Sequence, residues 1–110
     1  MLIAIAEPKI NFSPKFMHLE NLGFSFLGPS NNGRMDNHWI FFLSSLKNVN
    51  IFSLSTQALT CDYYLCSSHI FITFVYAKNN YIDRRSLWKE ISDINSLTQD
   101  PWVLVGDFNA

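Results

Sequence analysis

The sequence contains little charge, few glycines and few prolines. Charged residues make up 15% of the 110 residues, and eight Lys and Arg stand against nine Asp and Glu. This balance excludes a generally basic surface for nucleic acid, so any such contact has to be local. The four glycines form no phosphate-binding loop, and no serine lies in a nucleophile-elbow motif. Phosphate binding by a glycine-rich loop and acyl transfer through a serine therefore have no support.

Long hydrophobic runs are also absent. The longest run covers residues 70–77 and contains Thr73, far short of the ~20 residues that cross a bilayer. The apolar stretch at residues 1–6 lacks a basic lead and ends at Glu7, whereas a signal peptide has an apolar core of about 7–15 residues. The sequence thus predicts no membrane helix and no secretion.

The cysteines and histidines do not form a metal-binding pattern. Cys61 and Cys66 are not spaced as a metal-type CxxC pair, and we interpret both as reduced thiols in a strand region. His18, His38 and His69 are isolated in sequence and fit no ligand spacing. Each is therefore interpreted as a surface or rim residue, and zinc hydrolysis has no support.

Hydrophobic residues, by contrast, make up 48% of the chain and aromatic residues 15%. This is more core-forming surface than a disordered chain carries, so the sequence predicts one small folded domain, or part of one. Apolar runs and period-two alternation predict strands over residues 2–6, 39–43, 51–58, 59–65, 70–76 and 102–105.

Two segments have helical spacing. The first covers residues 12–26 in part, with Gly23 as a stop. The second begins at Asn80 as N-cap, with Asp83 in a capping-box position. Its apolar stripe consists of Leu87, Trp88, Ile91, Ile94 and Leu97. The order of elements predicts a mixed α/β (α+β) fold, with a sheet or layered sandwich flanked by helices.

Acidic residues follow two of the predicted buried strands. Glu7 and Asp107 stand at the carboxyl ends of these strands, and Asn109 lies on the same loop as Asp107. Gly106 allows close backbone approach there. If the strands are neighbours, these side chains supply the hard oxygen ligands that hold hydrated Mg²⁺. The alternative is that each acid merely marks the edge of a strand.

Tyr76 ends a central strand and precedes the loop that contains Asn79. A phenol at this position can hydrogen-bond a phosphate oxygen or stabilise a leaving group, or it can be an aromatic at the sheet rim with its hydroxyl in water. Arg84 and Arg85 lie in the first turn of the predicted helix, where cations oppose the helix dipole at about 0.3–1 kcal/mol each. An anionic partner would offset this cost. Alternatively, nearby acids, Asp83 and Glu90, neutralise the arginines on a solvated face.

Four segments together resemble the endonuclease/exonuclease/phosphatase (DNase I-like) family, and more narrowly the endonuclease domain of plant non-LTR (LINE-type) retrotransposons. They are IAEPK at 5–9, FVYA at 74–77, RRSLW at 84–88 and PWVLVGDFN at 101–109. GDFN after a buried strand is the most specific piece. Around Glu7 the chain has Ala6 and Pro8 where the family usually has Gln and Thr.

The resemblance implies a four-layer α/β sandwich and Mg²⁺-dependent phosphodiester cleavage, with DNA as the partner, no small-molecule cofactor and a nuclear location. It also implies roles for single residues. Glu7 would bind the metal, Tyr76 would sit in the phosphate site, Asp107 would orient or activate the attacking water, Asn109 would bind the scissile phosphate, and Asn79, Arg84 and Arg85 would contact the substrate.

Two parts of the family pattern have no counterpart here, namely a first strand with a catalytic Asn before Glu7 and a second half with an Asp-His pair after Asn109. We therefore expect residues 1–110 to be an incomplete domain of about one sheet with flanking helices. Loss of a general acid/base alone typically costs about 10²–10⁴-fold in rate, so inactivity of the isolated chain is expected. An uncovered sheet face predicts self-association or aggregation.

A second hypothesis is a small non-enzymatic α/β binding or structural module. In that case Glu7 and Asp107 are ordinary acids at strand ends.

Overall fold

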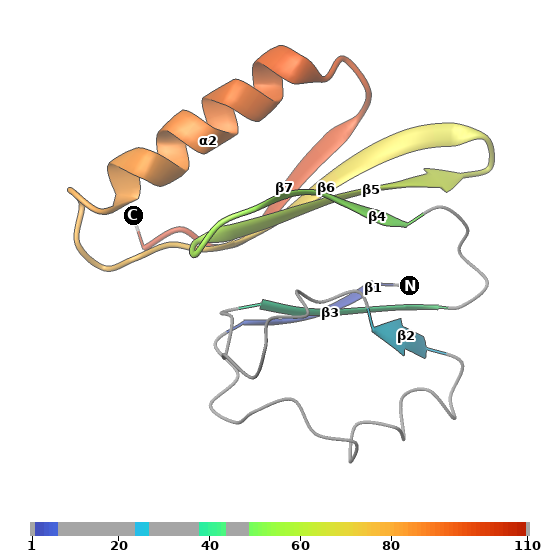
Figure 1. Cartoon of the computed structure of the whole chain (residues 1–110), viewed down its shortest axis with the longest axis horizontal. Coiled ribbons are helices and arrows are strands. Elements are labelled where there is room, and N and C mark those ends of the chain that lie inside the picture. The colour runs from blue at the N-terminus through green and yellow to red at the C-terminus, as the bar shows by residue number, and fades with distance from the viewer. Residues whose placement is uncertain (1, 7–23, 27–37, 44–48, 110) are drawn as a thin grey trace.

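The computed structural model describes residues 2–6, 24–26, 38–43 and 49–109, with side chains over 49–109. These residues form two sheets and a helix in three layers (Figure 1). The helix α2 lies on one side of a four-stranded sheet, and a three-stranded sheet lies on the other side. The elements are β1 (Leu2–Ala6), β2 (Phe24–Phe26), β3 (His38–Leu43), β4 (Asn50–Leu54), β5 (Ala58–Leu65), β6 (Ser68–Tyr76), α2 (Arg84–Leu97) and β7 (Trp102–Asp107).

The three-stranded sheet has the order β1-β3-β2. Both neighbours run antiparallel to β3, with Leu2 opposite Phe42 and Ala6 opposite His38 on the β1 side. β1 coincides with the predicted strand 2–6, and β3 extends the predicted strand 39–43 by one residue. The helical segment predicted over 12–26 lies largely outside the described residues, and its last three residues form β2.

The four-stranded sheet has the order β4-β5-β6-β7 and contains both kinds of strand pairing. β4, β5 and β6 form an antiparallel meander, whereas β7 joins β6 in parallel. A parallel neighbour requires a crossover connection, and residues 77–101 with α2 provide it. β6 is therefore the central strand, as its apolar character on both faces predicts.

The helix α2 begins one turn later than the capping pattern predicts. Its N-cap is Asp83, whose side chain makes no capping hydrogen bond. Asn80 instead accepts a hydrogen bond from the backbone N–H of Ile82 at 2.8 Å, which closes a turn before the helix. Of the predicted apolar stripe, Leu87 and Ile94 are buried, whereas Leu97 is 72% exposed.

Apolar clusters lie on both faces of the four-stranded sheet, because alternate residues of a strand face opposite sides. On the helix side, Ala58, Val75, Ala77 and Leu87 form a buried cluster. On the other face, Leu59 and Cys61 are fully buried, with Ile72 and Phe74 packed against them. The three-stranded sheet lies on this second face (Figure 1).

Buried polar groups on the helix side are paired with one another. The hydroxyls of Thr60 and Thr73 are 2.8 Å apart, and the indole Nε1–H of Trp102 donates to Thr73 Oγ1 at 2.8 Å. Both threonines are fully buried. This chain of hydrogen bonds joins β5, β6 and β7 and removes the cost of burying unpaired hydroxyls.

The structure confirms the α/β class and corrects three details of the prediction. The described residues form two sheets, where about one was expected. The face opposite α2 is consequently covered at its centre, where Leu59 and Cys61 are inaccessible. The predicted strand 51–58 ends at Leu54, because the Ser55 hydroxyl accepts hydrogen bonds from the backbone N–H groups of Gln57 and Ala58 and holds a turn.

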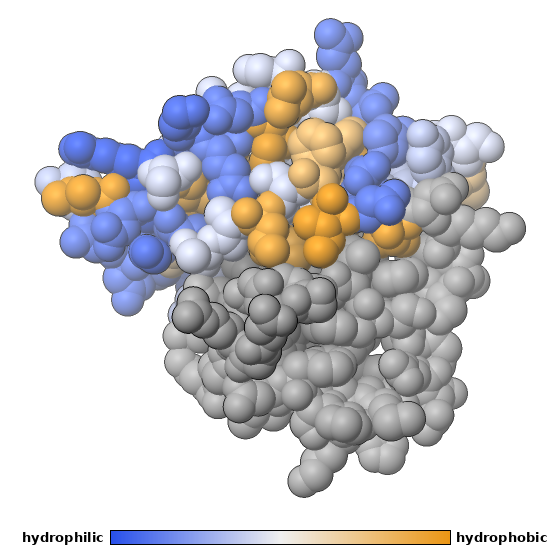
Figure 2. Space-filling model, viewed as in Figure 1, coloured by the Kyte–Doolittle hydropathy of each residue, from blue (hydrophilic) through white to orange (hydrophobic). Residues whose placement is uncertain are grey.

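Apolar side chains are exposed on both outer strands of the four-stranded sheet. Ile51, Phe52 and Leu54 of β4 are 38–42% exposed, and Val103 and Val105 of β7 are 48% and 39% exposed. Figure 2 shows hydrophobic surface gathered beside α2 and β4, between hydrophilic regions. A groove of about 340 Å³ lies there, lined by Phe52, Ser53, Ser86, Lys89, Glu90, Asp93, Ile94 and Leu97. Self-association through such strands stays a prediction.

Both cysteines are free thiols, as predicted. Cys61 is buried in β5, and burial raises the pKa of its thiol to about 12. Cys66 is exposed in the turn between β5 and β6. None of the described helical residues forms a segment with the length and hydrophobicity of a membrane span.

Candidate active site at the ends of β6 and β7

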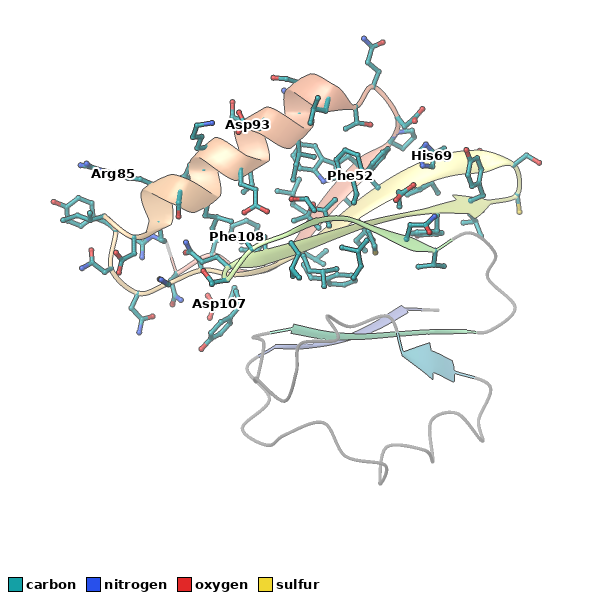
Figure 3. The ribbon with its side chains drawn as sticks, in the orientation of Figure 1. Phe52, His69, Arg85, Asp93, Asp107 and Phe108 are labelled. Atoms are coloured by element: carbon teal, nitrogen blue, oxygen red, sulfur yellow. The ribbon has the colours of Figure 1, made fainter. Side chains whose placement is uncertain are left out.

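The carboxyl ends of β6 and β7 bring Tyr76 and Asp107 together. The two residues are direct partners in the parallel register, the last pair of that ladder. Beyond it, the Ala77 N–H donates to the backbone oxygen of Asp107 at 2.8 Å. Asp107 is exposed and Tyr76 is half-buried. In Figure 3, Asp107 lies at the end of the sheet on the side away from α2, whereas Phe108 lies toward the helix.

Gly106 is required by the backbone just before Asp107. Its φ of +139° belongs to a backbone conformation that residues other than glycine rarely adopt. A Cβ added there would lie 2.0 Å from the carbonyl oxygen of Val75. The close approach of β7 to β6 thus depends on the missing side chain. This close approach fixes the position of Asp107 at the end of β7.

The loop after β7 is held by its own polar groups. The N–H of Asn109 donates to Asp107 Oδ1 at 2.9 Å, and Asn109 itself has a φ of +48°. The Asn109 amide Nδ2 donates to the Ala77 carbonyl oxygen. Between them, Phe108 stacks on Trp88 of α2 with ring centroids 6.2 Å apart and nearly parallel planes. Asp107 and Asn109 are therefore fixed next to each other and to the end of β6.

Gln57 is a residue at this end of the sheet that the sequence patterns do not reveal. It is 3% exposed, and its amide Nε2 donates to the Asp83 carbonyl oxygen and to Ser86 Oγ. Its Oε1 accepts from the Lys78 N–H at 2.9 Å. Gln57 thereby connects the β4–β5 turn to the loop after β6 and to the start of α2, and it supports the site without belonging to it.

Of the predicted substrate-contacting residues, Asn79 lies in the loop that follows β6, and Arg84 and Arg85 are the first two residues of α2. Arg84 Nη1 donates to the carbonyl oxygens of Lys78 and Asn79, at 3.0 and 2.7 Å. The Arg85 guanidinium lies 5.8 Å from the ring centroid of Tyr81. Ion pairs of either arginine with an acid do not occur among the described residues. The two interpretations above, an anionic partner or neutralisation by Asp83 and Glu90, both stay predictions.

Glu7, the predicted metal ligand, lies outside the described residues. The strand before it, β1, ends at Ala6. In Figure 1, β1 runs toward the end of the molecule at which β7 ends. The assignment of Glu7 as a ligand stays a prediction.

The described residues include two side chains with oxygen atoms of the kind that Mg²⁺ prefers. No group of three or more His, Cys, Asp or Glu side chains that could hold a metal ion occurs within the described part of the chain. Asp107 contributes one carboxylate, and the Asn109 amide, which donates through Nδ2, has its oxygen left as an acceptor. Mg²⁺ is commonly bound by one or two carboxylates, with water and substrate phosphate in the other positions. These groups fit a hydrated Mg²⁺ if a second carboxylate joins them.

A second polar cluster lies at the opposite end of the sheet, around His69 (Figure 3). Its ring Nε2 lies 2.8 Å from Asp62 Oδ2, and Nδ1 lies 2.9 Å from Asp100 Oδ2. The ring also stacks on Tyr64 at 4.8 Å. A neutral imidazole has one N–H, so two carboxylate partners favour the doubly protonated ring. The hydrogen bond to Asp62, followed by that to Asp100, raises the pKa of His69 above its ordinary value.

This cluster predicts a pH-dependent contribution to stability. Because the pKa of His69 is higher in the folded than in the unfolded chain, its contribution is complete below the unfolded pKa of about 6.5 and is lost as pH rises through the folded pKa. We expect His69→Gln to lower the free energy of unfolding more at about pH 5.5 than at about pH 9. Urea unfolding of both proteins at each pH measures this, and an equal loss at the two pH values would contradict it.

Comparison with known proteins shows a likeness at the level of fold. No protein-family model and no curated protein matches the chain. The solved structure of the human Nocturnin catalytic domain with bound sulfate anion matches 99% of this chain, with a TM-score of 0.56 and 21% sequence identity. The match covers 51% of the Nocturnin chain, so the present chain spans about half of that domain. The DNase I-like fold class that the sequence predicts is confirmed.

Proposed function

We propose that this chain forms part of a metal-dependent phosphodiester hydrolase whose substrate is DNA, with its site where β6 and β7 end. One observation carries the proposal, which is the parallel register that sets Tyr76 beside Asp107, with Asn109 bonded to Asp107 and to Ala77 just after β6. The fold adds support by analogy. The matched domain is catalytic and holds a sulfate, an anion with the tetrahedral shape of phosphate.

Each residue then has a role that its position allows. Asp107 would orient or activate the attacking water, and the Asn109 amide and Tyr76 hydroxyl would bind oxygens of the scissile phosphate. Asp107 and Glu7 would hold the cation. Mg²⁺, when bound, supplies polarisation of a phosphoryl oxygen and a more acidic water. Asn79, Arg84 and Arg85 would contact the nucleic-acid backbone, where cations supply most of the affinity.

We further propose that the chain derives from a plant LINE-type retroelement and is inactive by itself. The amino-acid sequences of the FVYA, RRSLW and GDFN segments support this origin. The flanking genomic sequence tests it directly. An upstream strand with an Asn and a downstream Ser-Asp-His motif, even in another reading frame, would support the proposal, and unrelated flanks would contradict it.

The metal site can be tested without activity, by adding Mn²⁺ as a paramagnetic substitute for Mg²⁺ to the isotope-labelled chain. We expect selective broadening of the amide resonances of residues 107–109 and its loss in Asp107→Ala, because Mn²⁺ prefers the same oxygen ligands. Asp93→Ala is the matched control, since Asp93 is an exposed carboxylate on α2 that pairs with Lys89. Broadening that is uniform, or that persists in Asp107→Ala, would rule out the assigned site.

The inactivity of the isolated chain is measured by plasmid nicking in Mg²⁺. Background cleavage is expected for the chain and for Asp107→Ala alike. Nicking that requires both Mg²⁺ and Asp107 would overturn the inactivity while supporting the proposed chemistry.

Self-association of the same preparation is measured by sedimentation over a range of protein concentrations. The exposed residues of β4 and β7 predict such self-association.

A further inference from the structure

We propose that Tyr81, Ile82 and Arg85 form a stacking shelf for an unpaired nucleotide, with the base on the Tyr81 ring and the phosphate beside Arg85. This inference rests on the proposed function, since it specifies the single-stranded portion of the nucleic acid that the site would engage. It concerns binding and requires no metal.

The shelf is an exposed aromatic surface next to a cation. Tyr81 is 64% exposed and Ile82 is 52% exposed, and both lie in the loop between β6 and α2. The Arg85 guanidinium carbon lies 5.8 Å from the Tyr81 ring centroid, within the range of a cation–π contact. Proteins that bind single strands combine such aromatic rings, on which bases stack, with cations that follow the backbone.

Local charge favours an anion at the same place. Residues 78–85 contain the cations Lys78, Arg84 and Arg85 and one acid, Asp83, a local charge of +2 in a chain whose net charge is −1. The three cations form no ion pair within the described residues. The first turn of α2 contains no acidic residue, so the positive end of the helix dipole adds to the same field. Because the overall charge is balanced, a contact with nucleic acid has to be local, and these residues supply a local positive charge.

The loop is also held in one conformation before any ligand binds. Arg84 Nη1 bonds to two carbonyl oxygens of the loop, and the Asn80 side chain accepts from the Ile82 N–H. Gln57 Oε1 accepts a hydrogen bond from the Lys78 N–H. A prearranged surface loses less entropy when a ligand binds. These contacts therefore prepare Tyr81 and Arg85 for binding instead of leaving the loop to be ordered by the ligand.

The position of the shelf relates it to the candidate site. The loop follows Tyr76 directly at the end of β6, and Figure 3 places Arg85 at the same end of the molecule as Asp107 and far from His69. A strand that stacks on Tyr81 would lie at the end of the sheet where Tyr76 and Asp107 meet. Because every base has a π-face, we expect this contact to tolerate any sequence.

The test is fluorescence anisotropy of a short fluorescein-labelled oligothymidylate, with the full chain in low salt and EDTA. We expect Tyr81→Ala to weaken binding by about ten-fold or more and Tyr81→Phe to retain it, because stacking needs the ring and not the hydroxyl. Tyr64→Ala is the matched control, since Tyr64 is 48% exposed and lies at the other end of the sheet beside His69. Its binding should equal that of the unmodified chain.

Further arms separate stacking from simple charge. Arg85→Gln should weaken binding and reduce its salt dependence. Oligouridylate should bind as well as oligothymidylate, and a blunt duplex should bind more weakly because its bases are already stacked. Absence of binding, equal loss in Tyr64→Ala, or unchanged affinity in Tyr81→Ala would each overturn the shelf. Since EDTA removes divalent cations, failure of the metal site leaves this result unaffected.

Discussion

Gly106→Ala should lower the free energy of unfolding by about 3 kcal/mol, the largest effect we expect from a single methyl group in this chain. The added Cβ would lie 2.0 Å from the Val75 carbonyl oxygen, closer than any real contact, and the φ of +139° is unfavourable for alanine even without that clash. Relief requires β7 to move away from β6. That movement would break the ladder pairs that hold Asp107 beside Tyr76.

Urea unfolding followed by circular dichroism measures this loss. Asp107→Ala is the control, because it truncates the neighbouring, exposed side chain and introduces no backbone strain. Its loss in the free energy of unfolding should stay within about 1 kcal/mol. If Gly106→Ala is as stable as Asp107→Ala, then β7 does not approach β6 as described, and the geometry of the candidate site is wrong.

Leu87→Ala should cost a similar amount, about 3 kcal/mol within the usual range of 2–5 for buried leucines. Leu87 is fully buried and belongs to the cluster of Ala58, Val75 and Ala77, against which Ile91 of α2 also packs. Its truncation removes apolar contacts and leaves a cavity under the helix. Because α2 is the crossover between β6 and β7, its weakening also affects the end of the sheet that holds the site.

The same helix provides a matched control for this prediction. Leu97→Ala makes the identical chemical change at a residue that is 72% exposed, and its effect should lie within about 0.5 kcal/mol of zero. The difference between the two variants in one urea series separates the effect of burial from that of the Leu→Ala change itself. Equal effects would contradict the packing of α2 through Leu87.

Patterns local in sequence predicted most elements of the fold. Strands 2–6, 59–65 and 70–76 are found within two residues of their predicted bounds, because their apolar runs reflect burial in a sheet. Strand 51–58 was predicted too long, since Ser55 and Gln57 continue the alternation of polar residues although they form a turn. The division into two sheets has no local signature, because it depends on which distant strands pair.

The candidate site was predictable to a similar degree. GDFN identified Asp107 and Asn109, and the structure places Asp107 beside Tyr76 and bonds Asn109 to Asp107 and Ala77. The sequence had predicted that Glu7 meets Asp107, and Glu7 lies outside the described residues. Gln57 escaped notice because its hydrogen bonds reach the Lys78 loop and the start of α2, contacts that only the folded chain creates. His69 looked isolated for the same reason, since Asp62 and Asp100 become its partners only when β5, β6 and the loop before β7 assemble.

The mixed pairing of β6 has a consequence for how the chain folds. Its antiparallel side follows a two-residue turn at Cys66 and Ser67, both with positive φ, so the β4–β5–β6 meander closes only short loops. The parallel side must wait for the longer crossover through α2, whose closure costs more chain entropy. We therefore expect Tyr76 and Asp107 to meet late in folding. In a weakened variant we expect the same step to reverse first, so that the geometry of the candidate site is lost while the meander remains folded.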